Sequence, residues 1–399
     1  MGLLVQRMDN QLTNKEPYRA GRYVRQPGSF DAFVPEPLRP GMLRMDSKLA
    51  RLLSDADRAI GRLDGAAAIF PNPDLFVAAY SRKEALLSSQ IEGTQASMVD
   101  VLEYEMQEPE GRPLPPDVQE VVNHQRAMHF GLERLEELPV SNRLLREIHG
   151  VLMRGVRGER RRPGEFRRSQ NWIGPPGSTI QEATFVPPPV PETEQGMADL
   201  ERYINEDSET PILLKCGLVH YQFETIHPFE DGNGRMGRLL ITFMLGEQRV
   251  LARPLLYLSV FLKRNKPEYY RLLNHVRDTG DYEAWISFFL RGVREVSIEA
   301  TETAQRVLKM REEHIARALS EVNSAYGPPF VDHLLGHGAT TAKAAARGLA
   351  VSYPTANKLI SEFERLGLLE EVTGRSRGRV FVYRPYLDEL GGALPPDAR

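Results

Sequence analysis

The chain has 399 residues, of which 41% are hydrophobic and 26% charged, and its net charge is -3 at neutral pH. This composition is typical of a folded globular protein, and so small a charge demands neither nucleic acid nor an anionic membrane as partner. At roughly 100–200 residues per domain, the length favours two or three domains. The single cysteine, Cys216, excludes an intramolecular disulfide and a cysteine-based zinc site.

No apolar run reaches the ~18 residues that a membrane-spanning helix needs. The N-terminus, MGLLVQRMDN, lacks the apolar stretch of a signal peptide, and Gln6 stands where a myristoylation signal has Ser or Thr. We therefore expect a cytoplasmic protein without a membrane partner.

Residues 1–40 are rich in Arg, Pro and Gly and are expected to form an irregular arm. Periodic apolar residues predict helices over 46–62, 74–106, 117–136, 142–154, 193–206, 211–226, 235–248, 264–279 and 281–320. Gly93 interrupts the second helix at a cost of about 1 kcal/mol relative to Ala, so its presence needs a reason. Residues 108–117 are predicted to be a linker, and residues 178–189 a short extended flap.

The C-terminal region has a different pattern. Ala339–Gly348 and Ser352–Leu366 are predicted to be two helices, followed by two strands around an Arg/Gly-rich loop. This order is typical of a winged-helix domain. Three arginines in the loop favour phosphate contacts with DNA, whereas the mixed charges of the second helix favour protein interaction or dimerisation. Both interpretations stay open at this point. The three loop arginines are Arg375, Arg377 and Arg379.

The segment His227–Arg238, HPFEDGNGRMGR, concentrates the residue types that phosphoryl or nucleotidyl transfer requires. Gly232 and Gly234 precede a predicted helix, whose first N–H groups and dipole attract phosphate. Arg235 and Arg238 are three residues apart, so they share one helix face and can reach the same anion.

Two further residues of this segment suit the same chemistry. Asp231 can hold Mg²⁺ together with phosphate oxygens. His227 has an ordinary pKa of about 6.5, which suits a base that removes a proton from a hydroxyl group. The segment is not a Walker A loop, because it contains no Gly-Lys-Ser/Thr.

HPFEDGNGRMGR matches the Fic family signature, His-x-Phe-x-Asp/Glu-Gly-Asn-Gly-Arg-x-x-Arg, at every fixed position. RRPGEFRRSQNWIG (161–174), the flap and FLKRNKPEYYRLLN (261–274) also resemble Fic-protein features. Roughly residues 45–320 are similar to bacterial Fic proteins with an N-terminal helical domain. Such proteins typically move AMP from ATP to a Ser, Thr or Tyr hydroxyl of a target protein. The resemblance therefore implies a protein adenylyltransferase that uses ATP as substrate and Mg²⁺ as cofactor.

The resemblance also implies a role for individual residues. His227 would be the general base, Phe229 the anchor of the loop, and Asp231 the Mg²⁺ ligand, while Asn265 would contact the nucleotide. The flap at 178–189 would hold a target segment by strand addition. The phosphate-binding residues would be Gly232, Asn233, Gly234, Arg235, Met236, Gly237 and Arg238.

A second signature lies upstream, in SSQIEG at Ser88–Gly93. Ser88, Glu92 and Gly93 fit the inhibitory helix of the family. A carboxylate brought to the phosphate site would pair with Arg238 and repel ATP. We therefore expect an autoinhibited enzyme.

The expected fold is mainly α, with a helical Fic core, a small β-hairpin flap and a C-terminal winged helix. The expected parts are an N-terminal regulatory region (1–115), a catalytic domain (116–294), a connecting helix (295–325) and a winged-helix-like domain (326–399). Three alternative functions stay open: a Fic-type kinase, an enzyme that removes AMP from its target, and an ATP-sensing, DNA-binding regulator. The target, the acceptor residue and a homodimeric state also stay open.

Four other expectations concern single residues or segments. The arginine-rich run Arg157–Arg168 fits either a nucleic-acid patch or support of the flap, and its context favours the support role. His220 is expected to pack in the core or to support the loop. Trp172 and Trp285 are expected to be core aromatics.

Overall fold

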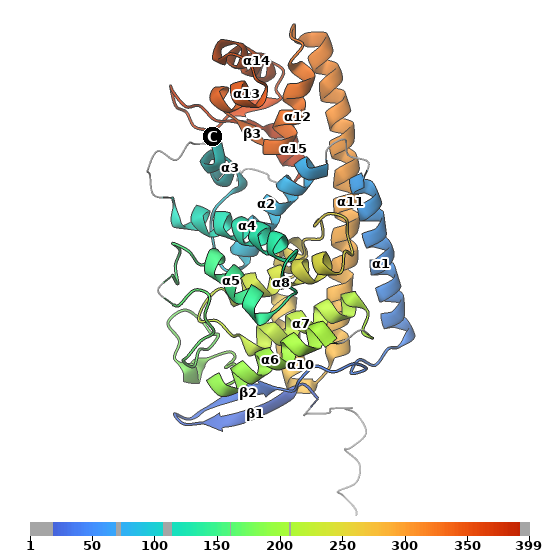
Figure 1. Cartoon of the computed structure of the whole chain (residues 1–399), viewed down its shortest axis with the longest axis vertical. Helices are drawn as coiled ribbons and strands as arrows, with labels where there is room; N and C mark the ends of the chain where they lie inside the picture. Colours follow the sequence, from blue (N-terminus) through green and yellow to red (C-terminus); the bar gives the residue numbers. More distant parts are fainter. Residues whose placement is uncertain (1–18, 69–72, 107–113, 160, 207–208, 392–399) are drawn as a thin grey trace, which may run out of the picture.

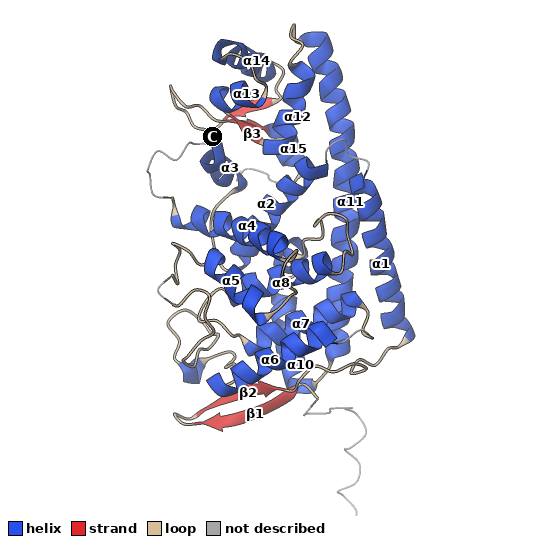
Figure 2. Ribbon diagram, viewed as in Figure 1, coloured by secondary structure: helices blue, strands red, loops and turns tan. Residues whose placement is uncertain are grey.

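The computed structural model describes residues 19–68, 73–106, 114–159, 161–206 and 209–391. In this part the protein is mainly helical with two small antiparallel sheets, as Figure 2 shows, so the predicted fold class is confirmed. The helices are α1 (Ser47–Ala68), α2 (Pro73–Ile91), α3 (Met98–Met106), α4 (Pro116–Arg134), α5 (Asn142–Leu152), α6 (Val190–Glu206), α7 (Ile212–Ile226), α8 (Asn233–Glu247), α9 (Ser259–Arg264), α10 (Lys266–Thr279), α11 (Tyr282–Glu321), α12 (Gly327–His337), α13 (Ala342–Gly348), α14 (Tyr353–Arg365) and α15 (Arg384–Glu389). The strands are β1 (Gly21–Gln26), β2 (Phe30–Pro35), β3 (Ala339–Thr340), β4 (Leu369–Glu371) and β5 (Phe381–Tyr383).

Helix α11 is the longest element and extends from the end of the molecule near β1 and β2 to the end that carries α12–α15 (Figure 1). Asp281 caps its first turn by accepting a hydrogen bond from the N–H of Ala284 at 3.0 Å. Helix α1 packs alongside it. α11 continues without a break across the expected boundary between residues 294 and 295, so it belongs to both of the parts that it joins. Among the described helices, none is both long and apolar enough to cross a bilayer.

Helices α7 and α8 form the centre of the main hydrophobic core. Every residue from Leu213 to Ile226 is buried, which is the pattern of a helix covered on all sides. Helix α4 approaches α8 closely at Gly131, where a Cβ would overlap the ring of Phe243. This tight packing fixes α8, and therefore the motif loop that leads into it.

The expectation of an irregular arm over residues 1–40 is wrong for its second half, because residues 21–35 form the hairpin β1–β2. Tyr23 pairs with Phe33 across the hairpin, and their ring centroids are 5.0 Å apart. The N–H of Phe33 also donates to the carbonyl of Val186 at 3.0 Å, so the hairpin rests on the flap region. Residues 1–18 lie outside the described part.

Two predicted helices are interrupted. Instead of one helix over 74–106, α2 ends at Ile91 and α3 begins at Met98. In the turn between them Gly93 has φ +105°, a conformation that favours glycine, which explains its place in the sequence. The helix predicted over 264–279 is divided at Asn265 into α9 and α10. Of the predicted linker, residues 108–113 are outside the described residues.

The C-terminal unit comprises α12–α15 and the sheet β3–β5–β4 (Figure 1). It contains the two helices and two strands predicted from the sequence, with α12, β3 and α15 in addition. Side chains of α2, α3 and α4 share a small apolar cluster with this unit; its members include Leu86, Val101, Val121, Val380 and Val382. The unit therefore packs directly on the helix that carries Ser88.

Two wing arginines of this unit form ion pairs with glutamates. Arg375 contacts Glu103 of α3 at 2.8 Å, and Arg379 contacts Glu364 of α14 at 3.2 Å. The loop between β4 and β5 is thus tied to α3 of the N-terminal region as well as to α14.

A pair of glycine substitutions tests the packing of α4 on α8. Gly131→Ala should lower the free energy of unfolding by about 1–3 kcal/mol, because the added methyl group overlaps Phe243. Gly61→Ala in α1 meets nothing within 4 Å and should raise it by about 0.5–1 kcal/mol, because alanine favours helix interiors. Urea unfolding of both variants measures the difference, and equal effects would contradict the tight contact.

Candidate active site

The motif loop connects two buried helices and has a fixed backbone. α7 ends at Ile226, and His227 adopts a left-handed conformation (φ 51°, ψ 60°), which is uncommon for a residue with a side chain. Gly232 is also left-handed (φ 77°) just before α8. The Asn233 side chain closes the loop, since it donates to the carbonyl of Phe229 and accepts from its N–H, both at 2.8 Å.

Phe229 anchors the loop in the core and stacks on the ring of His149, with 3.8 Å between the centroids. His149 accepts from the N–H of Gly164 through Nδ1 at 2.9 Å, so Nε2 carries the proton toward the carbonyl of Asp231 at 3.0 Å. This pattern requires a neutral ring, and burial lowers the pKa of His149 to about 4. No local sequence pattern indicated this role, because His149 lies about 80 residues before the loop.

Arg167 holds the other side of the loop. Its backbone N–H donates to the carbonyl of Pro228 at 2.8 Å, and its Nε donates to that of His227 at 3.1 Å. The same buried guanidinium donates to the carbonyl of Pro188 and to Thr193 Oγ1. Arg167 therefore joins the loop to the end of the flap, which is the support role expected for its segment.

The flap is held by one β-bridge between Ile173 and Phe185, with hydrogen bonds of 2.8 and 3.0 Å. The guanidinium of Arg277 lies 3.5 Å from the centroid of the Phe185 ring. The expectation that Trp172 is a core aromatic is wrong: 43% of it is exposed, and its indole N–H donates to Ser178 within the flap. Trp285, by contrast, is completely buried, as expected.

The imidazole ring of His227 is neutral, which is the protonation state that a general base needs. Burial, followed by the Arg167 guanidinium, lowers the pKa of His227 to about 4, so the ring is neutral at pH 7. Among the described residues, Nδ1 is enclosed by protein without a hydrogen-bond partner.

The start of α8 offers N–H groups that can bind an anion, and Glu92 lies beside it. The first N–H groups of a helix have no acceptor within the helix; here they belong to Asn233, Gly234 and Arg235. Glu92 Oε1 lies so close to Gly234 that a Cβ there would overlap it. The same oxygen accepts from Arg238 Nη2 at 2.7 Å.

Ser88 adds to this contact from the preceding turn of α2. Arg238 donates through Nε to Ser88 Oγ at 2.8 Å and through Nη2 to the Ser88 carbonyl at 3.0 Å. Burial alone would raise the pKa of Glu92, but the Arg238 guanidinium outweighs it and the pKa is lowered. The structure thus brings together Ser88, Glu92 and Arg238, which the sequence had singled out separately.

Four other predicted site residues have side chains or backbone groups that contact other parts of the protein. The Met236 side chain is in the core and its N–H donates to Gly232 at 3.0 Å, which gives this residue a packing role. Gly237 is buried, and its carbonyl lies 2.9 Å from His220 Nδ1. Asn265 donates its side-chain amide to the carbonyl of Phe261 at 2.9 Å.

The fourth, Arg235, has a guanidinium that is only 3% exposed. Its Nη1 lies 3.6 Å from Glu120 Oε2, and its Nη2 lies 3.6 Å from Met153 Sδ. As the side chain is placed, its contacts are with protein and not with the open end of the anion site.

Glu224 is a site residue that sequence analysis missed. It is buried on α7 one turn before His227, and its Oε1 lies 2.5 Å from where a Cβ of Gly237 would be. Burial raises the pKa of Glu224 to about 7; the charge of Arg238 acts against this rise, and that of Glu92 adds to it. The available signal was an acidic residue just before the motif, in a helix that is otherwise largely apolar.

Asp231 fits the expected role of a Mg²⁺ ligand. Its Oδ1 accepts from the N–H of Gly232 at 2.7 Å, while Oδ2 lies 3.9 Å from Arg161 and the side chain is 28% exposed. Mg²⁺ usually takes one or two carboxylates together with phosphate oxygens and water. No group of three His, Cys, Asp or Glu side chains gathers as metal ligands in the described residues, so Mg²⁺ here would depend on Asp231 and on ligands from ATP and water.

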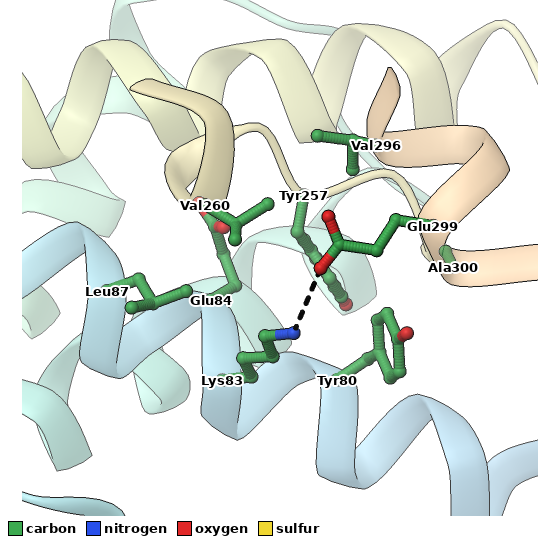
Figure 3. A pocket seen from close by; sticks show the side chains of 9 residues that line it. All are labelled: Tyr80, Lys83, Glu84, Leu87, Tyr257, Val260, Val296, Glu299 and Ala300. Carbon is green, nitrogen blue, oxygen red and sulfur yellow. Dashed lines mark ion pairs between the residues drawn. The ribbon is translucent and has the colours of Figure 1, made fainter. Parts of the chain in front are cut away.

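A separate small hollow lies between α2, the start of α9 and α11 (Figure 3). Lys83 and Glu299 face each other across it at 3.9 Å. Glu84 accepts from the hydroxyl of Ser259 at 2.5 Å, so a buried carboxylate ties α2 to α9. The hollow borders the helix that carries Ser88 but is lined by none of the motif residues. Its lining comprises Tyr80, Lys83, Glu84, Leu87, Tyr257, Val260, Val296, Glu299 and Ala300.

Known proteins share both the N-terminal region and the motif region. The sequence pattern of the Fic/DOC family N-terminal region matches residues 50–133, and that of the Fic/DOC family matches residues 139–245. A probable protein adenylyltransferase of Aquifex aeolicus (strain VF5) is 30% identical over 174 residues, 43% of this chain and 49% of that protein. The protein adenylyltransferase Fic of Drosophila melanogaster is 30% identical over 127 residues, 31% of this chain and 23% of that protein. The chain therefore matches about half the length of the first relative and about a quarter of the second.

The fold has a counterpart among solved structures. A crystal structure of a Fic family protein from Desulfovibrio desulfuricans G20 superposes with a TM-score of 0.53, covering 87% of this chain and 98% of that one at 21% identity. The sequence matches include both Glu92 and the whole motif loop, and the superposition extends the likeness in fold to most of the chain. The chain belongs to the Fic/DOC family.

Proposed function

We propose that this protein is an adenylyltransferase that moves AMP from ATP to a hydroxyl group of a target protein and releases pyrophosphate. The observation that carries the proposal is the loop His227–Arg238, which holds a neutral histidine and a helix N-terminus with a buried arginine in one rigid turn. The names of the Aquifex and Drosophila relatives support the same activity.

The site residues divide the work of this reaction. His227 would take the proton of the target hydroxyl, whose oxygen then attacks the α-phosphate of ATP as the bond to the β-phosphate oxygen breaks. The N–H groups at the start of α8 and the Arg238 guanidinium would bind the phosphates and stabilise their charge. A Mg²⁺ ion on Asp231 would neutralise part of that charge. The target segment would lie along the flap, at 178–189.

Glu92 would inhibit this reaction. Its carboxylate lies over Gly234 and pairs with Arg238, so a phosphate cannot take the same place. ATP would have to displace a charge-assisted hydrogen bond, which is among the stronger polar contacts in proteins. Transfer therefore requires the end of α2 to move.

The first prediction is that Glu92→Gly raises AMP transfer about tenfold or more over the wild type, because Arg238 then becomes available to ATP. Glu92→Gln is the matched control: it keeps the shape, loses the charge and should give an intermediate rise. ATP labelled on the α-phosphate, incubated with cell lysate, measures transfer to protein. The label should be absent when Glu92→Gly is combined with His227→Ala.

Other outcomes of this experiment would support other functions. Label on protein from the γ-phosphate alone would indicate a kinase. Release of AMP from labelled protein would indicate an enzyme that removes AMP from its target. Sequence-specific DNA binding without turnover would favour a regulator. Equal transfer by Glu92→Gly and the wild type, with equal ATP binding, would exclude inhibition by Glu92.

The second prediction concerns pH. Because the pKa of His227 is lowered to about 4, the neutral base persists as pH falls below its ordinary pKa. The negative charge of Glu92 raises the pKa of His227, so removing Glu92 should lower this pKa further. Transfer by Glu92→Gly should therefore change less than about twofold between pH 7 and 5.5, whereas a histidine with pKa about 6.5 would lose roughly eightfold. Initial rates across this range measure it, and a midpoint near 6.5 would contradict the burial effect.

A further inference from the structure

The turn after α2 takes part in two arginine–glutamate pairs of the motif. It carries Glu92, the partner of Arg238, and it contacts Glu120, the partner of Arg235. Glu92 pairs with Arg238 at 2.7 Å. Two residues later, the hydroxyl of Thr94 donates to Glu120 Oε2 at 2.7 Å, and the same oxygen lies 3.6 Å from Arg235 Nη1. The two arginines, one turn apart on α8, thus each have a glutamate partner, and one short turn touches both pairs.

The pair of Arg235 and Glu120 is enclosed by protein. Thr94, Glu120 and Arg235 are 6%, 8% and 3% exposed. Within the described structure, Nε and Nη1 of Arg235 have no hydrogen-bond acceptor. A buried cation with so few bonds depends on its nearest negative charge, so the loss of the Glu120 charge would leave Arg235 uncompensated.

Glu92 and Glu120 lie in different elements, and in the proposed opening only the turn that carries Glu92 has to move. Glu92 lies in the turn that must leave the anion site. Glu120 lies in α4, which is packed on α8 through Gly131 and binds the same turn a second time, since Asp117 accepts from the N–H of Gln95 at 2.7 Å. When the turn leaves, Glu120 stays beside Arg235 and loses only the hydrogen bond from Thr94.

We propose that Glu120 is a positioning residue that fixes Arg235 beneath the anion site, and that its hydrogen bond from Thr94 is a second latch on the inhibitory turn. The inference rests on the proposed function and assigns part of its regulation to a contact separate from Glu92. The latch favours the closed state, because a hydroxyl that donates to a buried carboxylate gains a charge-assisted bond that it loses on opening.

The latch is tested with Thr94→Val, which keeps the shape and removes the hydroxyl, and with Thr94→Ser, which restores the hydroxyl. Thr94→Val should tighten ATP binding about tenfold, as measured by calorimetry, and should speed hydrogen exchange of the amides of residues 88–96. Thr94→Ser should behave as the wild type. ATP affinity and exchange rates equal to the wild type in Thr94→Val would overturn the latch.

This readout does not require turnover, so it separates the latch from the proposed activity. Failure of Glu92→Gly to transfer AMP, with tighter ATP binding by Thr94→Val, would refute the activity and support the latch. Transfer of AMP by Glu92→Gly, with no effect of Thr94→Val on ATP affinity, would support the activity and refute the latch.

The positioning role is tested by Glu120→Gln in the Glu92→Gly background, where inhibition is already absent. The KM for ATP should rise about tenfold while kcat changes less than about twofold, because a misplaced Arg235 disturbs the anion site and leaves His227 in place. Glu133→Gln, an exposed residue of the same helix, is the control and should change neither constant. An unchanged KM in Glu120→Gln, even with reduced stability in urea, would show a merely structural role and overturn the inference.

Discussion

The charge of Arg238 needs a partner, and much of the site follows from this need. Its guanidinium is almost completely buried in the second turn of α8, where a cation is stable only beside an anion or several acceptors. Glu92 and Ser88 supply these contacts at 2.7–3.0 Å. In the proposed reaction a phosphate of ATP would take the place of Glu92. One side chain would then serve both regulation and catalysis, because only one anion fits against it at a time.

The loop around Arg238 is held by residues outside the motif. His149 stacks on Phe229 and orients the carbonyl of Asp231, while Arg167 binds the carbonyls of His227 and Pro228. These contacts stabilise the left-handed backbone of His227, which is costly for a residue other than glycine. A site fixed in this way needs little rearrangement when charge develops on a phosphate, which is the main source of electrostatic stabilisation in enzymes.

The end of α2 is bound from several directions. Lys266 donates to the carbonyl of Ile91 at 2.6 Å, Glu84 accepts from Ser259 of α9, and Arg82 donates to the carbonyl of Gly336 in the C-terminal unit. The position of Glu92 therefore depends on α9, α10 and the C-terminal unit together. The C-terminal unit therefore packs on the same helix that carries Ser88 and leads into Glu92.

The sequence by itself determined the local features of this protein. It predicted most long helices from their apolar period and the glycine turn before α8, and it singled out Ser88, Glu92 and Gly93 at the end of α2. These features depend on neighbours in the chain, so a local pattern is enough to specify them.

Only the tertiary structure decided which distant segments contact one another and which side chains are buried. The hairpin β1–β2 rests on the flap, His149 contacts a loop about 80 residues away, and the pKa values of His227 and Glu224 are set mainly by burial. Trp172 is exposed although its type favours the core, because the segment just before the flap, which carries it, lies at the surface. Burial and long-range pairing arise from segments that meet only in the folded chain, and a periodic pattern in one segment does not record which distant segment will cover it.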